Sequence, residues 1–204
     1  MKNVDYQKSR SALRYLLLGK EFHLAHKAFE LGLEHHIGTR KDGVTPEFQH
    51  QISQGLYICT LAKSLTYPEL TLATAFLHDI VEDCGFPLES IYDEFGDQVG
   101  HAVELMTNQQ LGVKKDKKVY YQSMINDPIA SICKGVDRSH NHQTMVGVFT
   151  TAKMEDYISE TSDHILPMLK EARKKHTRQY EAYMNVTTLL KCQMEFVQAI
   201  VGKR

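Results

Sequence analysis

The chain has 204 residues, enough for one domain with a substantial core over residues 1–204 and little room for a second. Its 24 lysines and arginines nearly balance 25 aspartates and glutamates, which argues against a basic surface for nucleic acid or an anionic membrane. Four widely spaced cysteines and the absence of a long apolar run near the N-terminus predict a cytoplasmic protein whose cysteines are small buried side chains.

Apolar residues recur at three- and four-residue spacing and β-branched runs are short, so the sequence predicts an all-α fold, a single-domain helical bundle. Residues 108–118 are expected to be the least structured part. In chain order, helices are expected over residues 5–18 and 22–36, and a third is expected to start at Thr45. A fourth is expected to start near Thr66 and to run through residue 83, followed by helices over 87–95 and 97–106 and by one that starts at Asp127. Residues 151–204 are expected to be helical, with breaks near Pro167 and at 175–177.

A cluster of ionisable residues lies in the expected helix that starts near Thr66. The stretch FLHDIVEDC places one imidazole and three carboxylates within six positions of an apolar segment. Buried charges are costly unless they are paired or bound to a cation. At helical spacing His78 lies beneath Glu82 and Asp79 lies beneath Asp83, so both stripes are expected to face nearly the same way. The pattern predicts a metal site with a water-activating acid beside it.

Two further residues complete a candidate ligand set with His78 and Asp79. They are His50, in the early turns of the third expected helix, and Asp137, late in the helix that begins at Asp127. Two imidazoles and two carboxylates suit Mn²⁺, Fe²⁺ or Zn²⁺ better than Ca²⁺ or Mg²⁺. Four protein ligands leave open positions for water and substrate. Such an ion lowers the pKa of bound water and polarises a phosphoryl oxygen, while the acidic pair of the FLHDIVEDC stretch orients that water or takes its proton.

Most other polar and aromatic features have a structural interpretation. An isolated His-Asp pair is a weak signal, and the lysines at 114–118 are expected to form a solvated loop. Phe95 and the Tyr120-Tyr121 pair are expected in the core. The histidines expected to be solvated or structural are His23, His26, His101, His164 and His176, with His35 and His36 left open.

Four motifs in a fixed order resemble the hydrolase domain of the RelA/SpoT homologues, HD-superfamily enzymes that degrade the stringent-response alarmones ppGpp and pppGpp. The motifs are RKDG at 40–43, His50, FLHDIVED at 76–83 and DRSHN at 137–141. The resemblance covers about residues 20–175, and residues 176–204 are expected to form helices that pack on this core. It implies a free-standing small alarmone hydrolase with an HD-domain fold.

The resemblance also implies a reaction and a role for each motif residue. The reaction removes the 3′-pyrophosphate in one piece, giving GDP or GTP and pyrophosphate. By this resemblance, Mn²⁺ is bound by His50, His78, Asp79 and Asp137, the attacking water is activated by Glu82 and Asp83, the guanine base packs on Arg40 and Lys41, and the sugar and 3′-pyrophosphate contact Asn141 and Thr144.

Some positions depart from the family pattern and leave other functions open. His50 stands between two glutamines where His-Pro is more usual, and Ser139 replaces a common leucine. The alternatives are an HD phosphohydrolase for another nucleotide, such as NADPH or an adenine alarmone, and a catalytically silent nucleotide-binding module. Glu82 and Asp83 argue against the silent module. The expected partner is a small nucleotide, with no nucleic acid or membrane, and the sequence leaves the oligomeric state open.

Overall fold

A computed structural model describes residues 2–110 and 112–202, and within these ranges the chain is an all-α bundle, as predicted. A two-residue hairpin is the exception, with β1 (Gln109–Gln110) antiparallel to β2 (Val113–Lys114). The helices are α1 Lys2–Gly19, α2 His23–His35, α3 Gln49–Leu61, α4 Pro68–Leu77, α5 Ile80–Cys84, α6 Leu88–Phe95, α7 Asp97–Met106, α8 Lys117–Ser123, α9 Pro128–Met145, α10 Thr151–Glu160, α11 Leu166–Lys175 and α12 Tyr180–Val201.

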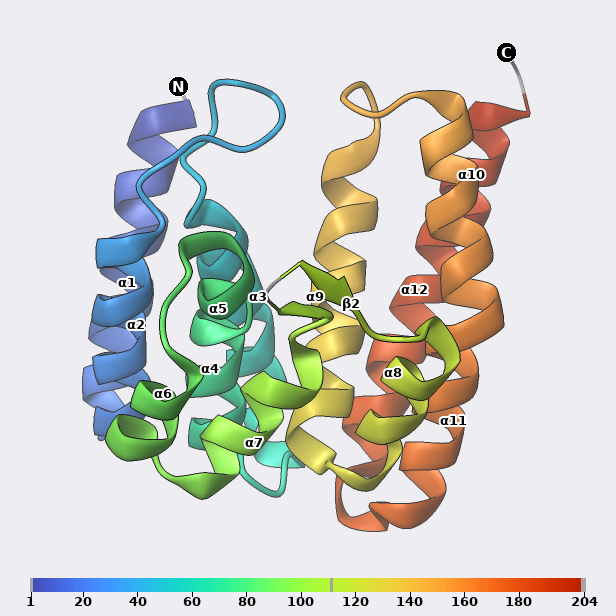
Figure 1. The fold of residues 1–204 in the computed structure, drawn as a ribbon. Helices are drawn as coiled ribbons and strands as arrows, with labels where there is room; N and C mark the ends of the chain where they lie inside the picture. Colours follow the sequence, from blue (N-terminus) through green and yellow to red (C-terminus); the bar gives the residue numbers. More distant parts are fainter. Residues whose placement is uncertain (1, 111, 203–204) are drawn as a thin grey trace.

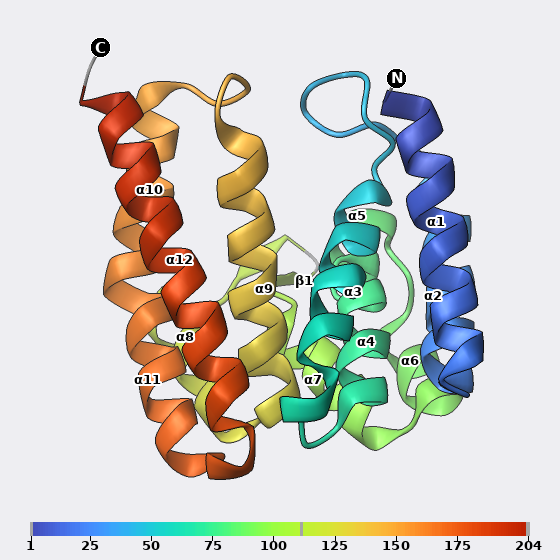
Figure 2. The same cartoon turned by 180° about the vertical axis from the view of Figure 1, so that it is seen from behind.

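The helices form two groups on either side of α9. Figure 1 shows α1 to α7 gathered on one side and α10, α11 and α12 on the other, and Figure 2 shows the same division from behind. Helix α9 packs on α3, α4 and α7 of the first group and on α11 and α12 of the second. Both groups therefore meet along α9, which makes this helix the place where distant parts of the sequence come together.

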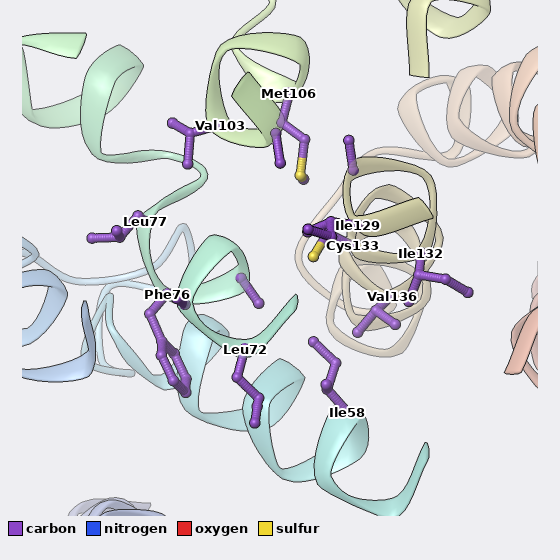
Figure 3. Close-up of a cluster of buried hydrophobic side chains, with 14 of the residues drawn as sticks. Ile58, Leu72, Phe76, Leu77, Val103, Met106, Ile129, Ile132, Cys133 and Val136 are labelled. Carbon is purple, nitrogen blue, oxygen red and sulfur yellow. The ribbon is translucent and has the colours of Figure 1, made fainter. Parts of the chain in front are cut away.

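The core between α4 and α9 sets the position of the polar clusters. Ile129, Cys133 and Val136 recur at helical spacing on α9, and they lie on the side of this helix that faces Leu72 and Phe76 of α4 in Figure 3. All five side chains are buried, and burial of one large aliphatic or aromatic side chain contributes roughly 1.5–3 kcal/mol. This packing brings the end of α4 next to the part of α9 that follows Val136.

The start predicted for α9 is confirmed, but that for α3 is wrong. Asp127 caps α9 by accepting hydrogen bonds from the backbone N–H groups of Ile129 (2.8 Å) and Ala130 (2.7 Å), as a cap before a proline should. Helix α3 begins at Gln49 rather than Thr45. The Thr45 hydroxyl donates to Asp42 Oδ2 at 2.6 Å instead of capping a helix, so the chain up to that point stays in a loop.

The later boundaries are close to those predicted. A π-helical turn, Thr161–Ile165, precedes Pro167, and α11 ends at Lys175. Proline has no N–H to donate to the preceding turn, which explains an irregularity at this place. The described residues of 108–118 hold the two short strands and the start of α8, which is more regular structure than expected.

The burial of the cysteines and the apolar character of the helices can be compared with what the composition predicts. All four cysteines are free, but only Cys133 is buried; Cys59 and Cys84 are half-buried and Cys192 is exposed, so the expectation that cysteines serve as buried side chains holds for one position. None of the described helices combines the length and the apolar character that crossing a membrane requires.

Candidate functional site

Four side chains from distant parts of the sequence converge beside α9. His50 Nε2 lies 3.1 Å from Asp137 Oδ1 and 3.8 Å from Asp79 Oδ2. His78 Nε2 lies 2.9 Å from Asp79 Oδ2 and 3.8 Å from Asp137 Oδ1. One donor atom each from His50, His78 and Asp137 lies within 4.8 Å of the others, which is close enough to share one ion. The structure thus brings together the four residues that the sequence predicts as ligands.

The break between α4 and α5 shapes this cluster. A single helix was predicted through residue 83, but α4 ends at Leu77, and His78 and Asp79 connect it to α5. The two acidic residues that follow do not share one face. Asp83 lines the pocket described below, whereas the Glu82 carboxylate turns toward the hairpin and accepts hydrogen bonds from the backbone N–H groups of residues 108 (3.1 Å) and 109 (2.8 Å).

His78 presents an unpaired nitrogen to the centre of the cluster. Its Nδ1 atom lies 2.9 Å from the carbonyl oxygen of Ala75, and donation there leaves the Nε2 lone pair free in the neutral ring. Nε2 is buried and makes no hydrogen bond of acceptable geometry, although Asp79 is near. An orphaned buried nitrogen facing two carboxylates fits a bound divalent cation.

His50 has two partners that sequence reasoning missed. Its Nδ1 lies 2.7 Å from Nδ1 of His140, and its Nε2 lies 2.6 Å from Nε2 of Gln54. Gln54 sits one helical turn after His50, so its proximity was readable from the spacing. His140 comes from α9, and nothing local in the sequence links the two histidines. Gln54 competes with an ion for the His50 nitrogen, while His140 fixes the orientation of the ring.

A buried lysine neutralises the Asp137 carboxylate and was also missed. Lys134 Nζ lies 3.0 Å from Asp137 Oδ2, with both side chains largely buried. Asn141 Nδ2 donates to the other oxygen at 2.8 Å. Lys134 and Asn141 stand three residues before and four residues after Asp137 on one helix face, a spacing that could have revealed both contacts. They hold Asp137 with Oδ1 directed at the two imidazoles.

The buried charges of the cluster shift the pKa values of one another. Burial alone lowers the pKa of His78, but the Asp79 and Asp137 carboxylates outweigh it and raise this pKa to about 10. Burial raises the pKa of Asp79, yet His78 lowers it to about 2. For Asp137, the ammonium of Lys134 overcomes burial and holds the pKa well below its usual range. The two carboxylates therefore favour a positive charge at the centre of the site.

Asp83 has a different environment from these ligands. Burial, followed by the nearby carboxylates of Asp79, Glu47 and Glu82, raises the pKa of Asp83 to about 6. A carboxylate with such a pKa takes up a proton near neutral pH more readily than an ordinary aspartate. This is the property expected of a group that accepts a proton from a water molecule.

A pocket of about 530 Å³ opens over the cluster, and charged side chains of both signs line it. The acidic ones are Asp42, Glu47, Asp79, Asp83 and Asp137. The basic ones are Arg40 and Lys41 of the loop before α3, and aromatic side chains complete the lining. Such a pocket matches a ligand that brings one anionic group to a metal ion and a second anionic group to the basic side chains.

The predicted substrate-binding residues line this pocket. Arg40 donates from Nη2 to Asn141 Oδ1 at 3.3 Å, and Asn141 in turn bonds Asp137, so a chain of polar contacts runs from the loop to the metal ligand. Lys41 Nζ lies 5.1 Å from the ring centroid of Phe149. Thr144 lines the pocket and donates to the carbonyl of residue 140 at 3.0 Å. All four therefore share one pocket with His50, Asp79 and Asp137.

The histidines and aromatic residues outside the ligand cluster contact other parts of the fold. The ring of His164 stacks on Tyr121, and His176 Nε2 lies 3.1 Å from a backbone carbonyl. His36, left open by the sequence, is buried with Nδ1 3.0 Å from the carbonyl of residue 32. Tyr120, Tyr121 and Phe95 are buried, and residues 114–118 are exposed, as predicted.

No family model matches the chain, but several known proteins are similar to it. It is 32% identical to a probable GTP pyrophosphokinase of Mycobacterium leprae over 128 residues, which cover 60% of this chain and 16% of that protein. It is 26% identical to GTP pyrophosphokinase rsh of Brucella melitensis over 153 residues (71% and 20%), and 27% identical to a GTP pyrophosphokinase of Streptomyces coelicolor over 155 residues (70% and 17%).

The matched region is a small part of each relative. The chain spans about a sixth to a fifth of the length of these curated proteins. Their names support the resemblance to the RelA/SpoT family, whose members are enzymes, and they describe pyrophosphokinases rather than hydrolases.

Proposed function

We propose that the protein is a metal-dependent phosphohydrolase that removes the 3′-pyrophosphate of ppGpp and pppGpp, giving GDP or GTP and pyrophosphate. The observation that carries this proposal is the convergence of His50, His78, Asp79 and Asp137 next to a pocket that is also lined by Arg40 and Lys41. Similarity to GTP pyrophosphokinases supports a guanosine nucleotide as the ligand of that pocket.

The donor set fits Mn²⁺, with Fe²⁺ or Zn²⁺ as related choices. Two imidazoles and two carboxylates form a mixed nitrogen and oxygen site, and the unpaired His78 Nε2 supplies a nitrogen in the required neutral form once its proton leaves. A bound divalent ion supplies Lewis acidity, which lowers the pKa of water and polarises a phosphoryl oxygen.

Side chains of the pocket would accept the proton of water and bind the substrate. Asp83 accepts the proton of the attacking water, since it lines the pocket and has a raised pKa. Glu82 holds the hairpin beside Asp83 and acts as a positioning residue in this scheme. Arg40 packs on the guanine base, and Asn141 and Thr144 contact the sugar and the 3′-pyrophosphate, since all three line the pocket above the ligand cluster.

Hydrolysis is favoured over pyrophosphate transfer by the make-up of the site, although the relatives are named for the transfer. A histidine and aspartate ligand set with an adjacent carboxylate of raised pKa is suited to activating water. A transferase must instead hold a second nucleotide as donor. The same region of the longer relatives is then expected to hydrolyse rather than synthesise alarmones.

The proposal is tested with purified protein, Mn²⁺ and ppGpp. We expect GDP and pyrophosphate in equal amounts, measured by chromatography and a pyrophosphate assay, and loss of turnover after chelation. Release of orthophosphate alone, or turnover of NADPH or an adenine alarmone in preference to ppGpp, would assign the metal site to another substrate. Thermal stabilisation by nucleotides without any turnover would show a silent binding module.

A further inference from the structure

The imidazole ring of His50 has close neighbours at both of its nitrogen atoms. Nε2 lies 3.1 Å from Asp137 Oδ1 and 2.6 Å from the amide nitrogen of Gln54. Nδ1, on the other side of the ring, lies 2.7 Å from Nδ1 of His140, and the two rings meet edge to face. Because Nε2 is the atom beside the carboxylates, it is the atom through which His50 can bind an ion.

Two observations place the hydrogen of the His50 ring on Nδ1. A ring nitrogen that binds an ion must offer its lone pair, so a neutral His50 that binds through Nε2 carries its hydrogen on Nδ1. The contact with Gln54 requires the same arrangement in the metal-free protein. An amide nitrogen donates and does not accept, and it therefore needs a lone pair on Nε2 of His50. His50 is thus held in one tautomer with and without an ion.

The position of this hydrogen determines the state of His140. The Nδ1–H group of His50 donates to Nδ1 of His140, so this second nitrogen must hold a lone pair. A neutral imidazole with its lone pair on Nδ1 carries its hydrogen on Nε2. Were Nδ1 of His140 to carry hydrogen instead, two N–H groups would face each other at 2.7 Å. His140 is therefore a hydrogen-bond donor at Nε2.

The Nε2–H group of His140 is available to a ligand. The ring is half-buried and lines the pocket over the ligand cluster. Among the residues that the structure describes, none forms a hydrogen bond with Nε2 of His140, and, unlike Nε2 of His78, this atom is not enclosed by protein. The pocket therefore contains a donor that is fixed in its tautomer and has no protein acceptor.

We propose that His140 is a further substrate-binding residue, which donates its Nε2–H to an oxygen of the pyrophosphate group and is kept in this tautomer by His50. The inference rests on the proposed function and deepens it, because it assigns a ligand contact in the same pocket to a residue without a role in that scheme. A neutral donor suits this place, since it bonds the anion without adding a positive charge that would repel the ion.

The first experiment determines the tautomers. Nitrogen NMR on protein with isotope-labelled histidine, loaded with diamagnetic Zn²⁺, distinguishes ring nitrogens that carry hydrogen from those that do not. The spectrum of His140→Asn identifies the signals of His140 by their loss. We expect hydrogen on Nε2 of His140 and on Nδ1 of His50. Hydrogen on Nδ1 of His140 would overturn the inference.

The second experiment separates the donor of His140 from its acceptor. Asparagine keeps an acceptor near the position of Nδ1 but has no counterpart of the Nε2 donor, whereas leucine has neither. By calorimetry on Mn²⁺-loaded protein, we expect His140→Asn to weaken pyrophosphate binding at least about tenfold while Mn²⁺ affinity changes by less than about threefold. His140→Leu should also weaken Mn²⁺ binding about 10–100-fold.

His101→Asn is the matched control, because it replaces an exposed histidine of α7 outside the pocket. It should bind Mn²⁺ and pyrophosphate as the wild type does. Unchanged pyrophosphate binding in His140→Asn, or unchanged Mn²⁺ affinity in His140→Leu, would overturn the inference.

Kinetics with ppGpp distinguish this inference from the proposed function. At saturating Mn²⁺ we expect His140→Asn to lower kcat/KM at least about tenfold, and His101→Asn to leave it unchanged. If the wild type does not hydrolyse ppGpp while pyrophosphate binding still depends on His140, the proposed reaction fails and the donor stands. If the wild type and His140→Asn hydrolyse ppGpp equally well, the donor fails and the proposed function stands.

Discussion

Lys134 is predicted to be the residue on which the metal-free site depends most. Its ammonium lies 3.0 Å from Asp137 Oδ2, and both groups are largely removed from solvent. At an effective dielectric constant of about 20, two unit charges at this distance attract by about 5 kcal/mol. Removing one partner of a buried pair typically costs about 3–5 kcal/mol, because the other charge is left without compensation.

We expect Lys134→Met to cost about 3 kcal/mol, at the lower end of that range. The reason is His78, whose pKa of about 10 keeps it protonated in the metal-free protein and partly compensates Asp137. For a chain of this size the loss corresponds to a fall in Tm of about 6–12 °C. Thermal unfolding in the presence of a chelator measures it, with Lys118→Met as the control for removal of a lysine.

A double-mutant cycle decides whether the ion pair is the cause. Asp137→Asn removes the charge that Lys134 compensates, so the double variant should lose at least about 2 kcal/mol less than the sum of the single losses. Additivity within about 0.5 kcal/mol would refute the reasoning, because Lys134 would then stabilise α9 through its hydrocarbon stem and not through Asp137.

Four further predictions concern three other acidic residues. Asp79→Ala should bind no metal in elemental analysis and gain no Tm from added Mn²⁺; retained stoichiometric metal would remove Asp79 from the ligand set. Asp83→Asn should keep its metal and lose about 10²–10⁴-fold in kcat. Because the pKa of Asp83 rises on folding to about 6, its ionised carboxylate opposes folding above that pH. The metal-free Asp83→Asn variant should therefore have a higher Tm than the wild type at about pH 7.5 and the same Tm at about pH 4. The gain in unfolding free energy at the higher pH is about 1 kcal/mol or less, because solvent reaches and screens part of this carboxylate; a gain at both pH values contradicts this. Glu82→Gln should keep metal and lose about 1 kcal/mol, since an amide oxygen replaces two carboxylate acceptors; loss of metal would make Glu82 a ligand.

The parts of the fold that follow from local chemistry were predictable. Helix α9 begins where its aspartate cap and proline indicate, and its apolar residues recur at the spacing that buries them against α4. The identity of the candidate ligands was also predictable, because burying histidine and aspartate in apolar segments is costly unless they are paired or bind a cation. Their convergence required only that the helices pack along those apolar faces.

The parts that depend on contacts between distant segments were not predictable. Nothing in the FLHDIVEDC stretch, which has neither glycine nor proline, marks the helix break at His78 and Asp79. The direction of Glu82 is set by backbone N–H groups of a hairpin more than twenty residues away. His140 contacts a ring nitrogen of His50 on another helix, and single-sequence patterns contain no information about such a pair.

The division of the ligands between the two helix groups makes a bound ion a cross-link. His50, His78 and Asp79 come from the group that contains α1 to α7, and Asp137 comes from the central helix that the other group packs against. An ion held by all four closes a long stretch of chain into a ring, as a disulfide does, and restricts the unfolded ensemble for as long as it stays bound. Loss of the ion would remove this restriction and leave the packing of α9 on the first group to its apolar contacts.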